Sequence, residues 1–262
     1  FKEYILQKSK TFNSQSSYNI ISVDDKNCLN ILKSYQSQFC NFIPISSVNK
    51  IKNGIYIFDN YIVDNFFYNK KIIPLNNISN SLNGHFNLQN ILATYAVSKI
   101  LKINTELFNK CIKNFKGLPH RMEKIYENKK VLIINNSKAT NLESAINSIK
   151  NFQNIYLIFG GKIKDKSFSS LIKYKKNIKK CYIIGKYSNY INKQISNNIN
   201  SKLSFNLEKA INYLILDLKN NENKKTILFS PGCSSFDQFS NFEQRGNLFK
   251  KLILKKIKKF NE

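Results

Sequence analysis

Lysine and hydroxyl side chains that could hold anionic groups follow two apolar segments in the second half of the chain. Lys138 and Thr140 come soon after the apolar run 131–134, and Lys164 comes soon after the run 155–159. A cation beside a helix N-terminus favours an anionic ligand, because the helix dipole is positive at that end. This pattern therefore indicates binding of phosphate or carboxylate groups.

The most informative segment, residues 230–246, reads SPGCSSFDQFSNFEQRG. It follows the strand-like run 226–229 and is interrupted by a Pro-Gly pair, which a continuing strand or helix would not tolerate well. Ser235 comes next, at the start of a helical pattern that we expect over about 236–259. A strand that ends in small polar residues at the start of a helix is a common ligand site in α/β proteins.

Ordinary structural roles account for part of these patterns. Thr140 and Glu143 have the spacing of a capping box, which leaves Lys138 without a structural role. Gly160 and Gly161 precede lysines as in a phosphate loop, but the Gly-Lys-Ser/Thr ending of the Walker pattern occurs nowhere in the chain. Two glycines after a strand more often indicate a tight turn or a close backbone approach.

Two further motifs combine polar residues with helix breakers or helix starts. Residues 117–121, Gly-Leu-Pro-His-Arg, interrupt every pattern, so we place a domain boundary there, where a crevice would suit Arg121. A single arginine is usually a surface charge, and His120 is more often a structural hydrogen-bonding residue than a catalyst. Asn87 and Asn90 fit helix caps, or amides that contact a base or sugar.

The second half of the chain alternates apolar runs with amphipathic segments, which predicts a mostly parallel sheet covered by helices on both faces. The predicted strands are 131–134, 155–159, 181–184 and 226–229, and the predicted helices are 142–152, 168–175, 187–195, 207–218 and 236–259. Right-handed crossovers would bring the ends of the strands to one edge. The residues that follow the strands should therefore face one crevice.

The first half of the chain is less regular. Its predicted helices are 1–12, 28–35, 88–100 and 106–115, and its predicted strands are 18–23, 54–58 and 61–63. Apolar residues of 88–100 follow the 3.6-residue period of an amphipathic helix. The asparagine-rich loop 76–83 is interpreted as a linker rather than a site.

Composition restricts the class of protein. The net charge of +26 comes from lysines spread along the whole chain, whereas Arg121 and Arg245 are the only arginines. Base and phosphate recognition usually depends on arginine, so a biased genome explains the charge better, and a basic nucleic-acid-binding module stays as an alternative. Scattered cysteines, no signal peptide and no apolar stretch long enough to cross a membrane favour a cytoplasmic protein.

Four segments, GLPHRME, NNSKATN, GGKIK and SPGCSSFDQFSNFEQRG, resemble the Mur ligase family in their order, and within it the ligases that add D-glutamate. The resemblance covers nearly the whole chain and is weakest between Lys26 and Asn83. It implies an α/β fold, with a C-terminal Rossmann-like, mostly parallel sheet domain at 117–262. This domain would be preceded by the C-terminal part of a P-loop-type ATPase central domain at 1–116.

The resemblance also implies an activity. Members of the family use ATP and Mg2+ to convert a carboxylate into an acyl phosphate, which the amine of an amino acid then attacks. Here the substrates would be UDP-N-acetylmuramoyl-L-alanine and D-glutamate, in peptidoglycan synthesis, and the protein would be a monomer that binds neither nucleic acid nor membrane. A folylpolyglutamate synthase-like ligase is an alternative, as is a gene remnant that keeps the fold without activity.

The resemblance assigns roles to residues at matching positions. Lys8, if carbamylated, would bind magnesium, and Lys138 and Arg121 would act in catalysis. The nucleotide would contact Asn87, Asn90, Arg121 and Asn136, and D-glutamate would contact Thr140, Lys164, Ser235, Phe236 and Phe242.

Three departures from the family pattern bear on activity. Asn136 stands where the family usually has an aspartate, and Phe86 stands where it usually has a histidine, with His85 one place earlier. The phosphate-binding loop, the other magnesium ligands and the UDP-binding domain should lie upstream of Phe1. We therefore expect that this chain alone does not turn over ATP.

Overall fold

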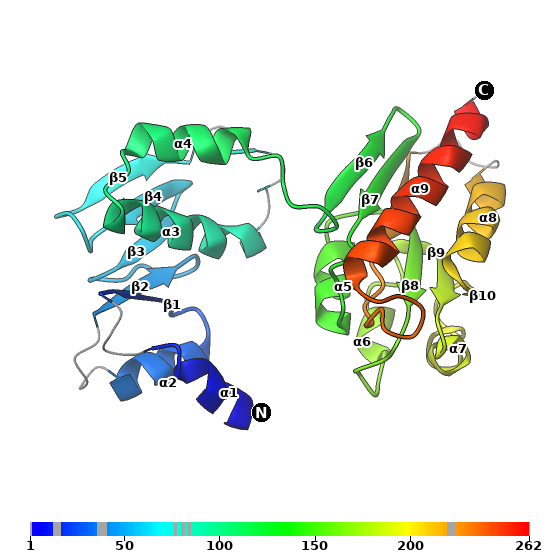
Figure 1. The fold of residues 1–262 in the computed structure, drawn as a ribbon, viewed down its shortest axis with the longest axis horizontal. Coiled ribbons are helices and arrows are strands. Elements are labelled where there is room, and N and C mark those ends of the chain that lie inside the picture. The colour runs from blue at the N-terminus through cyan, green and yellow to red at the C-terminus, as the bar shows by residue number, and fades with distance from the viewer. Residues whose placement is uncertain are drawn as a thin grey trace. The chain divides into compact units, whose positions relative to one another are not determined.

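The computed structural model describes residues 2–12, 17–35, 41–75, 78–79, 82, 85–218 and 224–261. The chain divides into two compact units, Phe1–Lys116 (unit 1) and Gly117–Glu262 (unit 2), each with its own sheet (Figure 1). No helix in these described ranges is both long and apolar enough to cross a membrane. Most of the predicted linker 76–83 lies outside the described residues.

Unit 1 is built on a five-stranded sheet with the order β1-β2-β3-β4-β5. Strands β1 to β3 are parallel, and the pairs β3–β4 and β4–β5 are antiparallel. The strands are β1 (Asn19–Ser22), β2 (Phe42–Ser46), β3 (Ile55–Phe58), β4 (Tyr61–Asp64) and β5 (Lys71–Pro74), and the helices are α1 (Lys2–Ser9), α2 (Lys26–Tyr35), α3 (His85–Ile100) and α4 (Thr105–Asn114). Strand isoleucines and α3 residues such as Leu92 and Tyr95 form its core.

The hairpin and the four helices that the sequence predicts for unit 1 are confirmed within a few residues. Asp59 and Asn60 connect β3 and β4 with φ angles of 48° and 61°, the positive values that a tight two-residue hairpin turn requires. The sequence does not predict β2 and β5. Each contains a proline, Pro44 or Pro74, and proline weakens the sequence signal of a strand.

Unit 2 has a six-stranded sheet with the order β10-β9-β8-β11-β7-β6, in which all pairs are parallel except β6–β7. The strands are β6 (Glu123–Glu127), β7 (Val131–Asn135), β8 (Ile155–Gly160), β9 (Ile178–Ile184), β10 (Ser201–Phe205) and β11 (Lys225–Phe229). The helices are α5 (Leu142–Ile149), α6 (Ser169–Ile172), α7 (Ser188–Ile195), α8 (Leu207–Asp217) and α9 (Phe242–Asn261). This sheet confirms the predicted mostly parallel α/β fold.

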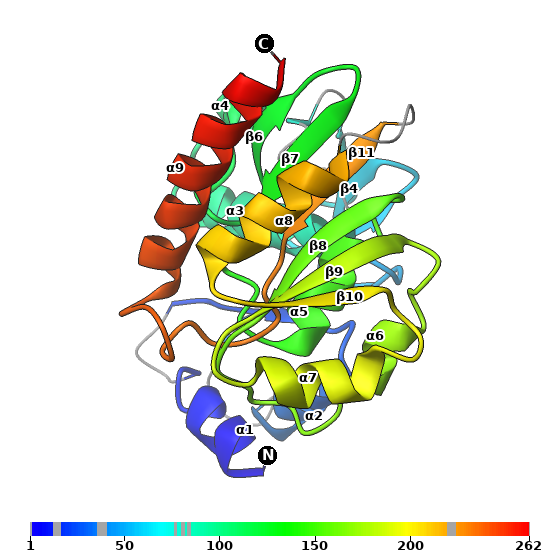
Figure 2. The ribbon, with the colours of Figure 1, turned by 90° about the vertical axis from the view of Figure 1, so that its right-hand side faces the viewer.

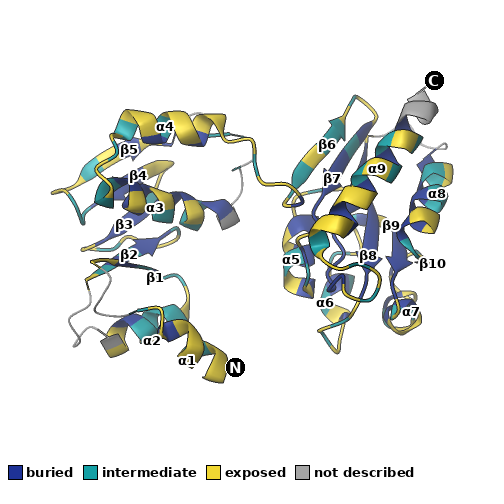
Figure 3. Ribbon diagram, viewed as in Figure 1, coloured by how far each residue is buried: buried dark blue, intermediate teal, exposed yellow. Residues whose placement is uncertain are grey.

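Helices cover both faces of the unit 2 sheet (Figure 2). Apolar residues of α5, α6 and α7 pack with Leu157, Phe159 and Ile183 on one face. Residues of α8 and α9 pack with Tyr156 and Ile158 on the other. Alternate residues of one strand thus enter opposite cores, which explains why β8 is buried at every position (Figure 3).

The last helix begins later than predicted. Residues 236–241 form turns, and α9 starts at Phe242 rather than at Phe236. Asn241 caps it, because its side chain accepts a hydrogen bond from the amide of Gln244 at 2.7 Å, and the Gln244 side chain in return accepts from the amide of Ser240 at 2.9 Å. The helical spacing of the phenylalanines at 236, 239 and 242 is therefore not a helix signal.

Other differences concern short elements. The sequence does not predict β6 and β10, which lie at the two edges of the sheet and whose residues, apart from buried Ser204, are partly buried or exposed. The predicted helix 168–175 is reduced to α6, a single turn. An edge strand contacts one neighbour only, so it needs fewer apolar residues and gives a weaker pattern.

Candidate functional site

The predicted crevice residues of unit 2 lie beyond the carboxyl ends of three adjacent strands. Strand β11 lies between β7 and β8, so the segments after these strands are neighbours. They carry Lys138 and Thr140 after β7, Ser235 after β11, and Lys164 after β8. The segments after β8 and β11 are joined by an antiparallel bridge in which the amides of Lys162 and Ser234 each donate to the other's carbonyl at 2.9 Å.

Glycines allow the close approach of these segments. Gly160 and Gly161 have φ angles of 121° and 138°. A Cβ at Gly161 would lie 2.4 Å from the carbonyl oxygen of Ser234, and one at Gly160 would lie 2.1 Å from that of Ile184. The two glycines therefore permit a close backbone approach, as predicted, rather than forming a phosphate loop.

Arg245 on α9 is buried and holds the segments after β7 and β11 together through hydrogen bonds. Its side chain is only 1% exposed and donates to the Ser137 carbonyl at 2.9 Å, the Ser137 hydroxyl at 3.1 Å and the Cys233 carbonyl at 3.0 Å. Burial lowers the pKa of Arg245 to about 10, and it forms no salt bridge with any residue that the structure describes. Sequence reasoning missed this residue, although a single arginine within a lysine-rich segment is a usable signal.

The Thr140 hydroxyl is not used to cap α5, contrary to the predicted capping box. The N-cap is Asn141, whose side chain accepts from the amide of Ser144 at 2.8 Å, and the Asp165 carboxylate accepts from the amide of Leu142 at 3.2 Å. Among the described residues Thr140 makes no side-chain hydrogen bond, and neither does the Ser235 hydroxyl, whose residue is 2% exposed. Both hydroxyls are thus available to a ligand.

The two predicted phenylalanines differ in their surroundings. Phe242 is half-buried, and the ammonium of Lys138 lies 4.0 Å from the centre of its ring. Phe236 is 68% exposed in the turn before α9. Lys164 is exposed and forms no salt bridge in the described part of the chain. Lys138 and Phe242 are therefore brought together, whereas Phe236 lies at the surface.

Asn136 is buried, and both ends of its side-chain amide are engaged inside unit 2. Its oxygen accepts from the amide of Met122 at 3.2 Å, and its nitrogen donates to the Ser230 hydroxyl at 3.2 Å. The Ser148 hydroxyl also donates to Ser230, at 2.9 Å. Asn136 therefore has a structural role at the strand ends, beside exposed Arg121, which was predicted to share its ligand.

In unit 1 the predicted nucleotide-contacting residues lie at the start of α3. The side-chain nitrogen of Asn90 donates to the Asn87 oxygen at 3.4 Å, and Gln89 between them donates to Asp24 at 2.9 Å. Asn87 is 8% exposed and Asn90 is exposed. The side chains of His85 and Phe86 lie outside the described residues. The Gln89 bond fixes this end of α3 to the strand end after β1.

Asp24 lies at the centre of a hydrogen-bond cluster after β1 and β2. Its two oxygens accept from the Ser46 hydroxyl at 2.5 Å, from the Ser47 amide at 2.8 Å and hydroxyl at 2.7 Å, and from Gln89. Burial raises the pKa of this carboxyl, but the hydrogen bonds outweigh burial and leave the pKa below its usual value. The carboxylate is therefore fully satisfied within unit 1.

The described residues contain no metal cluster, and the thiol of Cys233 in the strand-end segment is not activated. No group of three or more His, Cys, Asp or Glu residues there could hold a metal ion. Lys8 is exposed on α1, with its ammonium 5.7 Å from the ring centre of Tyr4. Burial raises the pKa of the Cys233 thiol to about 12, so this cysteine is not a nucleophile near neutral pH.

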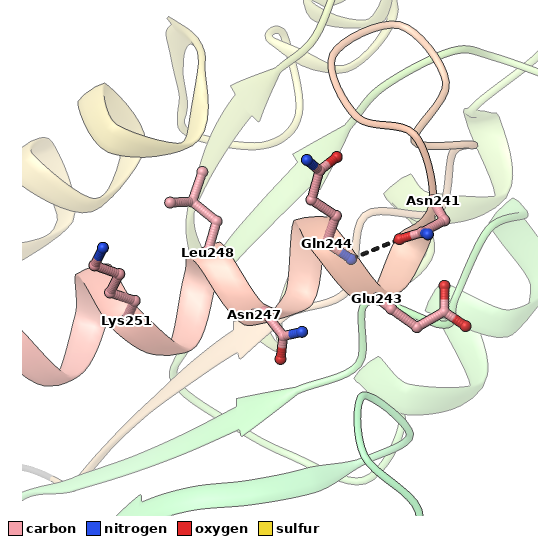
Figure 4. Close-up of a pocket in the computed structure, with 6 residues that line it drawn as sticks. All are labelled: Asn241, Glu243, Gln244, Asn247, Leu248 and Lys251. Atoms are coloured by element: carbon pink, nitrogen blue, oxygen red, sulfur yellow. Dashed lines mark hydrogen bonds between the residues drawn. The ribbon is translucent and has the colours of Figure 1, made fainter.

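A shallow surface pocket follows one side of α9 (Figure 4). Its lining residues are Asn241, Glu243, Gln244, Asn247, Leu248 and Lys251. They belong to the outer part of the helix and its cap, and none of the predicted ligand-binding residues lines it. The pocket is therefore distinct from the strand-end site.

Comparison with known proteins shows that the chain is similar to UDP-N-acetylmuramoylalanine–D-glutamate ligases, although no family model matches it. It is 37% identical over 254 residues to the UDP-N-acetylmuramoylalanine–D-glutamate ligase of Rickettsia bellii, and 41% identical over 191 residues to that of Buchnera aphidicola. The first alignment covers 95% of this chain and 56% of the relative. The chain thus spans about half the length of the curated relatives it matches.

Solved structures show the same fold at low sequence identity. A pseudomurein peptide ligase from Methanothermus fervidus matches with a TM-score of 0.64 and 16% identity, covering 98% of this chain and 60% of that one. A MurF ligase from Thermotoga maritima, solved with ADP, matches with a TM-score of 0.58 and 16% identity, covering 92% and 54%.

Proposed function

Because this chain belongs to the Mur ligase family, we propose that it takes part in the ATP-dependent ligation of D-glutamate to UDP-N-acetylmuramoyl-L-alanine. The observation that carries the proposal is the convergence of Lys138, Thr140, Ser235 and Lys164 beyond three adjacent strands. D-Glutamate has two carboxylates and an ammonium group, and such a ligand needs cations and hydroxyls at fixed positions. The relatives named for this reaction support the choice of amino acid.

Unit 2 would bind and orient the amino acid. Lys164 would pair with one carboxylate of D-glutamate, and the free hydroxyls of Thr140 and Ser235 would donate to its oxygens. The half-buried ring of Phe242 would shield one side of the amine from water. An amine held in this way can approach the activated carboxylate as a neutral nucleophile, once it has lost a proton.

Lys138 would neutralise charge where the acyl phosphate forms. Its ammonium lies on the Phe242 ring, so it is close to the amino-acid position and still exposed to a second ligand. Transfer of the terminal phosphate of ATP supplies the activation of the carboxylate. A fixed cation lowers the barrier by stabilising negative charge that develops on the transferred phosphate and on the tetrahedral intermediate.

Nucleotide binding would involve Asn90 and Arg121, whose side chains are exposed, together with Asn87. Asn136 has both ends of its amide engaged, so its part would be to hold Met122 and the backbone beside Arg121. The described residues do not fit a magnesium site by themselves, because they contain no cluster of acidic or imidazole ligands. A carbamate on Lys8 would add one oxygen ligand.

Calorimetric titration of the chain with D-glutamate tests the proposal. We expect binding of D-glutamate over L-glutamate, and a loss of about tenfold or more in affinity for Lys164→Met, because a charged hydrogen bond is removed. Lys162→Met is the matched control, since the Lys162 side chain is exposed two residues away. Equal affinity for the two enantiomers, or equal losses in the two variants, would contradict the proposed pocket.

A further inference from the structure

We infer that His120 is a positioning residue that holds the ammonium of Lys138 over the ring of Phe242. It fixes the backbone of Lys138 through a hydrogen bond and the ring of Phe242 through an edge contact. The role of Lys138 and Phe242 at the reaction site rests on the proposed function, but the arrangement that His120 imposes on them does not.

The backbone of His120 is the first part of this arrangement. His120 is 4% exposed and has a φ angle of 63°, a left-handed conformation that is uncommon for residues other than glycine, although asparagine, aspartate and histidine adopt it more often than the rest. In this conformation its amide donates to the Glu123 carboxylate at 3.0 Å, and its carbonyl accepts from the amide of Lys138 at 3.0 Å. The segment before β6 is thereby tied to the segment after β7.

The imidazole ring is the second part. The Nδ1 atom of His120 lies 2.8 Å from the side-chain nitrogen of Asn135, the last residue of β7. An amide nitrogen can only donate, so Nδ1 is the acceptor and the neutral ring carries its proton on Nε2. The same Asn135 nitrogen also donates to Glu123 at 3.1 Å. The ring is thus held in one orientation by the end of β7.

The start of α9 packs directly on this ring. The rings of His120 and Phe242 are edge-on, with centres 6.3 Å apart and planes at 78°. A Cβ at Gly246, one turn further along α9, would lie 2.3 Å from Nδ1 of His120, so only glycine permits this approach. Lys250, after a second turn, forms a salt bridge with Glu123. His120 therefore sets the position of the first two turns of α9.

These contacts converge on the pair Lys138–Phe242. The Lys138 backbone is held by the His120 carbonyl, the Phe242 ring is held by the His120 ring, and the Phe242 carbonyl accepts from the Ser137 hydroxyl at 2.8 Å. The ammonium of Lys138 lies 4.0 Å from the centre of that ring. His120 also directly precedes Arg121, so one residue links the segments that carry both predicted catalytic cations.

Nuclear magnetic resonance of the chain with 13C-labelled lysine tests the inference without any substrate. Methylene protons beside an ammonium that lies over an aromatic ring are shifted upfield. We therefore expect an upfield Lys138 resonance, together with one from Lys50, whose ammonium lies 3.7 Å from the ring centre of Phe58 in unit 1. Lys138→Arg should remove the Lys138 resonance, and Phe242→Leu should return it to the common position. A wild-type spectrum in which no upfield resonance disappears in Lys138→Arg would overturn the inference.

Substitution of His120 decides its role. His120→Ala removes the ring and the Nδ1 acceptor, and it should abolish the upfield shift and speed exchange of the Lys138 amide. His120→Asn tolerates the positive φ angle and places an acceptor near the Nδ1 position. It should keep the Lys138 amide protected while weakening the upfield shift, because only the ring contact is lost. A full wild-type shift in either variant would overturn the inference.

Phe168→Leu is the matched control for general loosening of unit 2. Phe168 forms a similar edge-on pair with Phe159, at 5.7 Å, in the core that α5, α6 and α7 cover. This variant should leave the Lys138 resonance unchanged, and loss of the shift here would show that His120 has no specific part. If His120→Ala does not fold, the Lys138 shift in His120→Asn alone tests the role of His120. Failure of D-glutamate to bind would leave all these spectra interpretable.

Discussion

Polar side chains follow the parallel strands in both units, but the cluster after β1 and β2 in unit 1 is satisfied, whereas two hydroxyls after β7 and β11 in unit 2 are available. After β1 and β2, the Asp24 carboxylate accepts from Ser46, Ser47 and Gln89. After β7 and β11, the hydroxyls of Thr140 and Ser235 have no hydrogen-bond partner among the described residues. Buried polar groups are normally paired, so a paired cluster indicates a structural role and unpaired hydroxyls indicate a place for a ligand.

Arg245→Leu should have the largest effect on stability, because the buried Arg245 guanidinium donates to two backbone carbonyls at the strand ends of unit 2. The change leaves the Ser137 and Cys233 carbonyls without their donors, which should cost roughly 3 kcal/mol of the unfolding free energy of unit 2. Amide signals of β7 and β11 during urea unfolding report on this unit separately. Lys251→Leu, on the exposed side of α9, is the control and should stay within about 0.5 kcal/mol.

Asp24→Ala should have the next largest effect, in unit 1. It leaves the donors of Ser46, Ser47 and Gln89 without an acceptor, and we expect a loss of about 2 kcal/mol, measured from the amides of β1 and β2. The neighbouring Asp25 is exposed and its carboxylate accepts from the amides of Asn27 and Cys28 at the start of α2, so Asp25→Ala should cost less than Asp24→Ala. Equal losses in the two variants would contradict a structural role that is special to Asp24.

Acid should weaken unit 2 before it weakens the Asp24 cluster. Burial lowers the pKa of His120 below its usual 6.5. The charge of Glu123 raises this pKa, whereas the charge of Lys250 lowers it further. The neutral ring therefore contributes stability that is complete above pH 6.5 and is lost as the pH falls through the lowered value. The pKa of Asp24 is lowered from 3.8, so its contribution is lost only below that pH.

Thermal unfolding followed unit by unit between pH 7 and pH 4 measures this difference. His120→Asn should remove the loss that begins near pH 6.5 in unit 2 and leave unit 1 unchanged. Simultaneous weakening of both units in wild type near pH 6.5 would contradict the assignment to His120.

Thr140→Val should have the smallest effect on stability and a clear effect on binding. Because Asn141 rather than Thr140 caps α5, we expect the unfolding free energy of unit 2 to change by less than about 0.5 kcal/mol. Affinity for D-glutamate should fall, since the hydroxyl is proposed to bind it. Asn141→Ala is the converse control, with a cost of about 1 kcal/mol in stability from the lost cap. A large destabilisation by Thr140→Val would show that this hydroxyl stabilises the fold, and it would contradict the proposal that the hydroxyl is free to bind a ligand.

Much of the fold could be predicted from local patterns. The central strands β7, β8, β9 and β11 are buried on both faces, so their apolar runs were visible in the sequence. The order of these runs, alternating with helices, indicated that the residues after them share one edge. The edge strands β6 and β10 were missed, because a strand with one neighbour needs less apolar surface.

By itself the sequence determined the family, the mostly parallel sheet and the segments that carry the candidate site. Only the tertiary structure decided which polar groups in those segments are free. Asn141 rather than Thr140 caps α5, and Asn136 is engaged with Met122 and Ser230. Arg245 bonds to Ser137, 108 residues away, and His120 bonds to Asn135 across a turn. Hydrogen-bond pairing between distant segments leaves no periodic trace in a sequence, so it could only be seen in the folded chain.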